Sequence, residues 1–434
     1  MLTKNVLVLG LDEGDREHLS TIRGAQQMRF HSLAEAEEVV GLIHYDIPGL
    51  LERVQARIRA FPERIDAIIG HYDFPVSTVL PLLRRELHHP TPSLEAVLAC
   101  EHKYWSRIVQ GEVVPEATPH YSVFDPFDDT ALLKVGLDYP YWMKPVKAFS
   151  SYLGFKIRSS QDFTEALHRT REGIGRFQRS FHHVLAKADL PAEIATVDGG
   201  YCIAEEIISA EHQATVEGYV HRGEVVCYGI IDSVRRPGES SFLSYEYPSA
   251  LPERVKSEMR RISERVMRHI GFDDGPFNIE YFWDDAADRV SLLEINPRIS
   301  KSHSPLFELV EGASHHEVVV DLAMGNAPAF PAGQGRYAIA GKYFIRRYQD
   351  AIVTRVPSED DIARLREAIP DTRVEVSARQ GEALSALMDQ DSYSYELAVV
   401  FIGAQSREEL RENYRRAEAF LPFEFADPPG EQTA

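Results

Sequence analysis

Acidic and amide side chains lie on two apolar segments that flank a polar turn, and their types could bind a metal ion. The segment FNIEYF at 277–282 alternates apolar and polar residues as a half-buried strand does, and VSLLEIN at 290–296 runs back as a second strand. On an extended strand Glu294 and Asn296 share a face about 6.6 Å apart. If the strands pair, Glu280 joins them from its neighbour. Two carboxylates and an amide oxygen suit Mg²⁺.

Cations follow the second strand directly. Arg298 and Lys301 come within a few residues of Asn296, and fixed cations beside a hard-oxygen metal site suit phosphate chemistry. Glu294 sits between two apolar residues in a segment that is typical of a buried strand, and a buried carboxylate is costly unless a metal ion or a cation pairs with it. For Glu280 alone, a solvated position is the ordinary alternative.

Composition limits the classes of protein to which the chain can belong. Its 434 residues, 44% hydrophobic and 26% charged, are those of a soluble globular protein with two to four domains. A net charge of −20 argues against nucleic-acid binding, which needs clustered cations. No apolar run reaches membrane-spanning length, and the apolar start is too short for a signal peptide. Three cysteines without metal-type spacing indicate a reducing cytoplasm.

The first ninety residues alternate short buried-type strands with helical segments. We expect strands at 5–10 and 67–70 and helices at 12–23, 50–60 and 76–87. This alternation predicts an open parallel sheet with helices on its faces. Gly10 after the first strand could approach a ligand, but no Gly-x-Gly-x-x-Gly follows it, so a dinucleotide fold that has lost its function is the alternative to a working site there. A loop at 88–93 marks a boundary.

Two lysines lie upstream of the acidic hairpin. Residues 93–109 have the pattern of one helix with Ser93 as its cap, and Lys103 lies on it. Lys144 lies within a strand-like apolar run at 140–146, where a lysine needs an anionic partner. A lone helix lysine is ordinarily solvated, so Lys103 by itself indicates little.

Two further segments could contact a nucleotide. The loop AFSSYLGF at 148–155 is rich in small residues, and the backbone N–H groups of Ser150 and Ser151 could face a phosphate, although hairpin loops also use serine without binding an anion. YCIAEEIISA at 201–210 is a predicted strand whose end could hold a base through its backbone; an ordinary strand end is the alternative.

The rest of the chain is predicted from periodicity and breaker residues. We expect a hairpin turn at 221–223, helices at 252–270 and 314–324, and a linker at 325–335. In the C-terminal part we expect a strand at 337–347, helices at 359–368 and 406–419, and a disordered tail at 424–434.

Taken in order, these motifs make the chain resemble the ATP-grasp superfamily, of the carboxylate–amine ligase type that includes amino-acid ligases and D-alanine–D-alanine ligase. The motifs are Lys103, Lys144, the serine loop, Glu-Glu-Ile-Ile at 205–208 and Glu-x-Asn-Pro-Arg at 294–298. The acidic hairpin is the most specific of them. The resemblance extends over about residues 1–330.

The resemblance implies an α/β fold, the ATP-grasp fold, preceded by a parallel-sheet domain and followed by an α+β lobe. The implied parts are a pre-ATP-grasp domain at 1–92, an ATP-grasp domain at 93–330 with a lid lobe at about 121–210 and a metal-binding lobe at about 211–330, and a C-terminal lobe at 335–425.

The resemblance also implies roles for individual residues. Lys103 and Lys144 would contact the phosphates of ATP, and Ser150 and Ser151 would form the lid over them. The adenine would be held by Glu205, Glu206 and Ile208. Gln213 would contact the ribose, with Glu211 as the alternative. Magnesium, with Mn²⁺ as the alternative ion, would bind Glu280, Glu294 and Asn296. Arg298 would steady the acyl phosphate, with Lys144 as a second catalytic cation. Substrate recognition would begin at Arg298, Ser300, Lys301 and His303.

Two departures from the family pattern concern the lid and the ribose contact. The lid usually has more glycine, whereas Phe149 and Tyr152 flank the serines here. The family usually places a glutamate for the ribose, and the run Glu211-His212-Gln213 leaves its position open.

The implied reaction joins a small-molecule carboxylate to an amine in two steps. ATP phosphorylates the carboxylate, and the amine then displaces phosphate. No general base is evident; His303 is a candidate, and a plain surface histidine is the alternative. The substrates and the oligomeric state stay open, and a homodimer is compatible with the sequence. Two other functions stay open: a carboxyphosphate-forming enzyme similar to biotin carboxylase or carbamoyl-phosphate synthase, and a catalytically inactive ATP-binding regulator.

Overall fold

The computed structural model describes residues 3–148, 152–208, 211–235, 241–387, 390 and 394–427. The chain divides into two compact units. The first consists of Met1–Gly229, Leu251–Lys301 and His315–Phe330, and the second of Ile230–Ala250, Ser302–Ser314 and Pro331–Ala434. The finer predicted division into a pre-ATP-grasp domain, two lobes and a C-terminal lobe stays a prediction.

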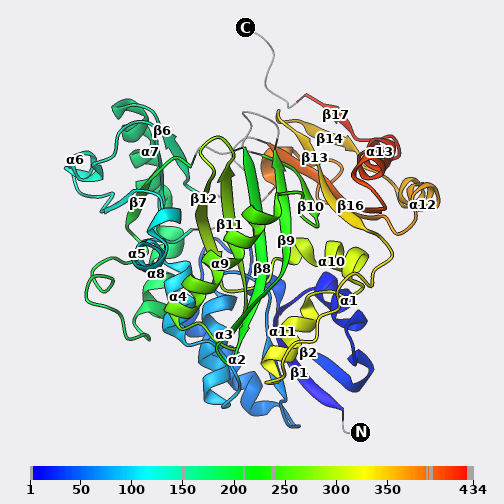
Figure 1. Cartoon of the computed structure of the whole chain (residues 1–434), viewed down its shortest axis with the longest axis horizontal. Coiled ribbons are helices and arrows are strands. Elements are labelled where there is room, and N and C mark those ends of the chain that lie inside the picture. The colour runs from blue at the N-terminus through cyan, green and yellow to red at the C-terminus, as the bar shows by residue number, and fades with distance from the viewer. Residues whose placement is uncertain are drawn as a thin grey trace. The chain divides into compact units, whose positions relative to one another are not determined.

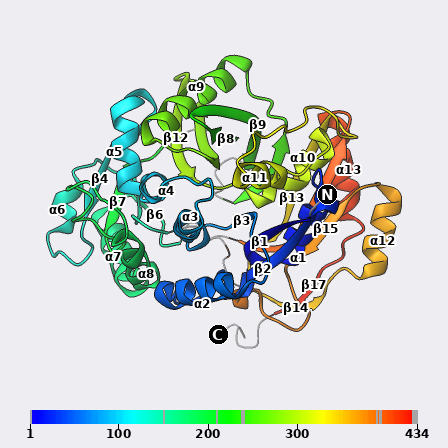
Figure 2. The ribbon, with the colours of Figure 1, turned by 90° about the horizontal axis from the view of Figure 1, so that it is seen from below.

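A three-stranded parallel sheet opens the first unit, in the strand order β2-β1-β3. All residues of β1 after Lys4 are buried, so both faces of this strand are covered. Helices α2 and α3 pack on one face, and α1 and α11 on the other (Figure 2). The predicted parallel sheet is confirmed, with one strand, β2, that was not predicted. The elements are β1 (Lys4–Leu11), α1 (Glu13–Thr21), β2 (Met28–Glu35), α2 (Ile47–Ala60), β3 (Ala67–Ile69), α3 (Val76–Glu86) and α11 (His316–Ala323).

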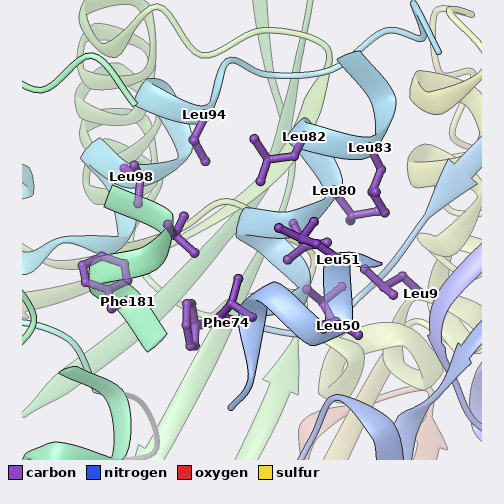
Figure 3. Close-up of a cluster of buried hydrophobic side chains, with 14 of the residues drawn as sticks. Leu9, Leu50, Leu51, Phe74, Leu80, Leu82, Leu83, Leu94, Leu98 and Phe181 are labelled. Carbon is purple, nitrogen blue, oxygen red and sulfur yellow. The ribbon is translucent and has the colours of Figure 1, made fainter. Parts of the chain in front are cut away.

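One apolar cluster joins this sheet to helices that follow it in the chain. Figure 3 shows leucine and phenylalanine side chains from β1, α2, α3, α4 (Leu94–Glu101) and α8 (Gly175–Leu185) gathered in one core. Leu83, Leu98 and Phe181 are fully buried within it. Burial of each such side chain contributes about 1.5–3 kcal/mol. The cluster therefore fixes α4 against the first sheet.

The predicted helix at 93–109 is wrong in one respect: it is two helices, α4 and α5 (Lys103–Val113), that meet at His102. The Ser93 side chain accepts a hydrogen bond from the Ala96 N–H, as a cap does. His102 is extended, and its Nδ1 accepts a hydrogen bond from the Trp105 N–H while its Nε2 contacts the Val197 carbonyl at 2.8 Å. The break places Lys103 in the first turn of α5.

A four-stranded antiparallel sheet follows, in the order β4-β7-β5-β6. Tyr141 and Met143 of β5 and Ala204 of β7 point toward a core that includes residues of α6 and α7. Because side chains alternate along a strand, Lys144 and Glu205 point to the opposite face. The elements are β4 (Tyr121–Phe124), α6 (Ala131–Val135), β5 (Tyr141–Pro145), β6 (Phe155–Ile157), α7 (Ser160–Gly173) and β7 (Cys202–Glu206).

The remaining strands of the first unit lie in the order β12-β11-β8-β9, and α9 packs on them (Figure 1). The predicted turn at 221–223 is confirmed, with Arg222 and Gly223 both at positive φ. The predicted helix at 252–270 is also confirmed. The elements are β8 (His212–His221), β9 (Glu224–Arg235), α9 (Glu253–Ile270), β11 (Gly275–Asp284) and β12 (Arg289–Asn296).

Strand β9 continues into the second unit, where the strand order is β9-β10-β13-β16-β15 and a separate pair is formed by β14 and β17. Part of the predicted disordered tail is wrong: residues 424–426 form β17, which pairs with β14. Helix α10 was not predicted. The elements are β10 (Phe242–Tyr247), α10 (Ser304–Glu311), β13 (Ile339–Arg347), β14 (Ile352–Arg355), α12 (Glu359–Ala368), β15 (Arg373–Val376), β16 (Tyr395–Ala404), α13 (Arg407–Glu418) and β17 (Glu424–Ala426).

Across the described parts of both units, no helix combines the length and the apolar character that a membrane crossing requires.

Candidate functional site

The acidic hairpin is present, and its register sets two carboxylates directly opposite each other. Strands β11 and β12 pair antiparallel, with Glu280 opposite Glu294 and Asn278 opposite Asn296. Like charges in directly opposed positions destabilise a sheet unless a cation lies between or beside them. The predicted pairing of the strands is therefore confirmed, and the register itself creates a need for positive charge.

Three amide side chains lie on the strands that carry Glu280 and Glu294 or on the neighbouring strand. The Gln213 Nε2 donates to Glu280 Oε2 at 3.0 Å. The Asn296 Nδ2 donates to Asn278 Oδ1 at 2.9 Å, and the Asn278 Nδ2 donates to the Arg298 carbonyl at 3.0 Å. The side chain of Asn278, which the sequence did not single out, thus orients Asn296 and the residues that follow it.

Lys103 brings positive charge to the hairpin from α5. Its Nζ lies 2.8 Å from Glu294 Oε1 and donates to the Ala148 carbonyl at 2.7 Å. Burial raises the pKa of Glu294, but the charges of Lys103 and Lys144 outweigh burial, so the pKa lies below its ordinary value. Glu294 is therefore ionised at neutral pH and able to bind a cation.

A second ion-pair network is centred on the carboxylate of Glu205. The Lys144 Nζ contacts Glu205 Oε2 at 2.6 Å, and the Arg107 Nε donates to Glu205 Oε1 at 2.7 Å. Arg107 also donates to the carbonyls of Leu292 and Leu293, at 3.1 and 2.7 Å. The network therefore ties α5, β5, β7 and β12 together through one buried guanidinium.

Burial raises the pKa of Glu205, but the charges of Arg107 and Lys144 outweigh it and lower the pKa to about 2. A carboxyl whose pKa is lower when folded than when unfolded stabilises the fold above its unfolded pKa. This contribution is lost as pH falls from about 4.5, the ordinary value, toward 2.

We therefore expect the Glu205→Gln variant to differ most from the wild-type protein in its free energy of unfolding at neutral pH, and less as pH falls below about 4.5. Urea unfolding at a series of pH values from 7 to 3 measures this difference. Glu193→Gln, at an exposed position, is the matched control, for which we expect a small and pH-independent difference. A Glu205→Gln difference that grows with acidity would contradict the expectation.

Arg298 is held by an acid from the parallel sheet. Its Nε and Nη2 donate to the two carboxylate oxygens of Asp73, each at 2.7 Å. Such a bidentate pair fixes the plane of the guanidinium. Asp73 follows the carboxyl end of β3, so the sheet positions the arginine that leaves the hairpin.

Two of the four residues predicted to begin substrate recognition, Ser300 and Lys301, follow Arg298 in the chain. The Ser300 N–H donates to Glu217 Oε1 at 3.2 Å. The Lys301 Nζ contacts Asp12 Oδ2 at 2.6 Å and the Tyr72 hydroxyl at 2.9 Å. Lys301 thus meets residues that follow the carboxyl ends of β1 and β3, where open α/β sheets usually bind ligands.

Sequence reasoning missed five residues that contact the predicted ones. They are Asp12 and Tyr72 at Lys301, Asp73 at Arg298, Arg107 at Glu205, and Glu217 at Ser300. The first three had a usable signal, since polar residues that directly follow predicted parallel strands gather at one edge of the sheet. Arg107 had none, because a helix arginine is ordinarily exposed, and here it is buried.

The other predicted residues fall in four groups. Ser150 and Ser151 lie outside the described residues. Glu206 pairs with His120 through backbone N–H and carbonyl at 2.8 Å, and Ile208 follows the end of β7. Gln213 is bound to Glu280, whereas Glu211 is exposed, so the ribose contact stays a prediction. His303 belongs to the second unit, where it is buried and its ring packs edge-on against Tyr245.

The donor set of the hairpin fits a hard divalent cation. Carboxylate and amide oxygens are what Mg²⁺ and Mn²⁺ accept, and each Mg²⁺ site in a phosphate-transfer protein usually has one or two carboxylates. Glu280, Glu294 and Asn296 supply such a set on one face of the sheet, and Lys103 stands where it balances the charge.

Comparison with known proteins gives one family match and several related structures. Residues 137–305 match the family model described as an ATP-grasp domain. An L-amino acid ligase from Bacillus licheniformis superposes with a TM-score of 0.70 at 15% identity, over 98% of this chain and 100% of that one. Carboxyaminoimidazole ribonucleotide synthase from Aspergillus clavatus, solved with ATP, gives a TM-score of 0.66 at 16% identity over 96% and 98%. At these identities the likeness shows the fold.

A short segment also matches the carbamoyl phosphate synthase large chain of Paenarthrobacter aurescens, with 35% identity over 75 residues. The match covers 17% of this chain and 7% of the length of that relative. Together with the family match and the parallel, antiparallel and C-terminal sheets, these findings confirm the predicted fold.

Proposed function

We propose that this chain, whose residues 137–305 match an ATP-grasp domain, is an ADP-forming ligase that activates a small-molecule carboxylate and joins it to an amine. The observation that carries the proposal is the opposition of Glu280 and Glu294 on paired strands, with the Lys103 ammonium against one of them. Two facing carboxylates with a lysine beside them form a place for a nucleotide-bound divalent cation.

In the proposed ATP site, Lys103 and Lys144 contact the phosphates, and Glu280, Glu294 and Asn296 hold Mg²⁺ or Mn²⁺. The ion supplies charge neutralisation for the phosphate oxygens when bound. Ser150 and Ser151 form the lid, and the chain from Glu205 to Ile208 holds the adenine. Gln213 or Glu211 contacts the ribose. Each of these roles is a proposal that rests on the resemblance to the ATP-grasp superfamily.

In the proposed reaction, the substrate carboxylate attacks the γ-phosphorus of ATP, and ADP leaves. The amine then attacks the acyl carbon, and the C–O bond to phosphate breaks. Arg298 is suited to stabilise the charge that develops on the acyl phosphate, because Asp73 already fixes the plane of its guanidinium. Lys144 provides a second cation. Ser300, Lys301 and His303 are the proposed start of the substrate site.

A second candidate is a carboxyphosphate-forming enzyme that uses bicarbonate as its carboxylate. The segment that matches carbamoyl phosphate synthase favours it. The predicted lid region between β5 and β6, with fewer glycines than such enzymes have, argues against it.

We expect sustained phosphate release to require Mg²⁺ together with one carboxylate and one amine, and to stop when either is withheld, because phosphate leaves only when the amine attacks the acyl phosphate. A screen of paired amino acids, with phosphate release as the readout and mass analysis of the products, measures this. A new product whose mass equals that of the two substrates minus water supports amide ligation. Bicarbonate-dependent ADP release that needs no other carboxylate would replace this proposal by the second candidate.

An Arg298→Lys variant, assayed in the same screen, tests the proposed role of Arg298. It keeps the positive charge but loses the planar fork that Asp73 binds. If Arg298 acts on the acyl phosphate, product formation falls while ATP binding is retained. Unchanged product formation would remove Arg298 from the proposed catalytic residues, and loss of ATP binding would place it in the nucleotide site instead.

A further inference from the structure

Two histidines and an aspartate meet inside the first unit. They are Asp15 in α1, His71 just after β3, and His316 at the start of α11. One ligand atom from each of the three lies within 4.8 Å of the others. All three residues are buried, with 0%, 2% and 0% of their surface exposed, respectively.

Polar atoms of this cluster lack hydrogen-bond partners. Within the described residues, Asp15 Oδ2 and both ring nitrogens of His71 are buried and make no hydrogen bond. Leaving a buried polar atom unpaired costs about 1–3 kcal/mol, so three such atoms in one place need an explanation. An ion bound between them would satisfy one atom from each residue.

The rings are arranged to present nitrogens to one another. The His316 Nε2 lies 3.2 Å from Asp15 Oδ1, and the His71 and His316 rings meet edge to face with their centroids 4.3 Å apart. His18 stacks on the outer face of His316 at 5.0 Å and restrains its ring. Packing of this kind orients imidazoles that act as metal ligands.

An ion pair with Lys301 is the competing account of the cluster. The Lys301 Nζ lies 3.0 Å from Asp15 Oδ1 and so balances the charge of that carboxylate. Lys301 also contacts Asp12 and Tyr72, which hold it to one side. The ion pair accounts for Oδ1 only, and neither Oδ2 nor the His71 nitrogens gain a partner from it.

We propose that Asp15, His71 and His316 form a binding site for a divalent first-row transition-metal ion that prefers imidazole nitrogen, such as Zn²⁺. Two imidazoles and one carboxylate are a common donor set for such ions, whereas the oxygen-only set at Glu280 and Glu294 suits Mg²⁺. The ion would join α1, the β3–α3 loop and α11, three segments that are distant in sequence. The proposal does not rest on the proposed ligase reaction, although Lys301, a residue of the proposed substrate site, contacts Asp15.

The test measures metal binding directly. Protein freed of metal by chelator dialysis is titrated with Zn²⁺, and separately with Co²⁺ followed by visible absorption, in excess Mg²⁺ to occupy the hairpin. We expect one Zn²⁺ per chain and a rise in the midpoint of thermal unfolding as Zn²⁺ is added. We expect Asp15→Asn and His316→Gln to weaken Zn²⁺ binding by at least about 100-fold, because removing groups that only orient metal ligands already weakens affinity by 10–100-fold.

Controls separate loss of a ligand from loss of the fold. His183→Gln changes an exposed histidine and is expected to bind Zn²⁺ as the wild type does. Asp15→Asn keeps the shape of the side chain, and circular dichroism of the metal-free variants checks that they fold. Failure of the wild type to bind Zn²⁺ or Co²⁺ at micromolar concentration would overturn the proposal. Equal binding by the wild type, a folded Asp15→Asn variant and a folded His316→Gln variant would overturn it too.

Discussion

The Glu294→Gln substitution is expected to lower Mg²⁺-dependent ADP formation by about 100-fold or more, a loss of the size seen when one preorganised electrostatic contact to a transition state is removed. The amide keeps the shape of the side chain but removes the charge that opposes Glu280 and pairs with Lys103. Two effects therefore combine: the metal loses a charged ligand, and Lys103 loses the carboxylate that holds it near the hairpin. Coupled measurement of ADP release over a range of Mg²⁺ concentrations records both.

The concentration dependence distinguishes a metal ligand from a merely structural acid. If Glu294 binds the ion, the Mg²⁺ concentration for half-maximal rate rises together with the loss of maximal rate. Asp285→Asn is the matched control, since it removes one negative charge from the exposed turn of the same hairpin. We expect this control to keep the wild-type rate. A Glu294→Gln enzyme with the wild-type rate would reject Glu294 as a metal ligand, whereas a wild-type protein that forms no ADP would favour the inactive-regulator function.

The acidic hairpin could be predicted from sequence because both of its determinants are local. Period-two alternation predicts which residues of each strand share a face, and the polar turn at 284–288 joins the two strands. The direct opposition of Glu280 and Glu294 also depends on a register shift between Glu280 and Tyr281, which was not predicted. The parallel sheet was equally local in its signals, since β1 and β3 are continuous apolar runs. Strand β2 was not predicted because it lies at the edge of the sheet, buries only Leu33 and Ala34, and has no apolar run in its sequence.

The partners of the site could not be predicted, because they depend on long-range packing. Asp73 and Arg298 are 225 residues apart, and Arg107 is 185 residues from the carbonyl of Leu292. The break at His102 also depends on a distant contact, with the Val197 carbonyl, which no helical pattern contains. The identities of Lys103 and Lys144 as site residues therefore came from the resemblance to a family and not from local pattern.

The Arg107→Ala substitution is expected to have the largest effect on stability, about 3–5 kcal/mol, because it leaves the buried Glu205 carboxylate with one partner fewer. The Arg107 side chain is 3% exposed, and it binds Glu205 and the carbonyls of Leu292 and Leu293. Its loss leaves Glu205 with Lys144 as its cationic partner and removes a hydrogen bond from each of two backbone carbonyls. Urea unfolding followed by circular dichroism measures the change in free energy.

Two further variants show whether charge or geometry carries this effect. Arg107→Lys keeps the charge but cannot reach all three acceptors with one planar fork, so we expect it to restore only part of the lost stability. Arg64→Ala removes an arginine that is 87% exposed and paired with Asp66 at 3.4 Å, and we expect a change below about 1 kcal/mol. Equal stability of Arg107→Ala and Arg64→Ala would contradict a structural role for the buried network.

Since Arg107 binds the carbonyl of Leu293, the residue before Glu294, Arg107→Lys is also expected to weaken Mg²⁺-dependent activity more than its stability loss alone explains.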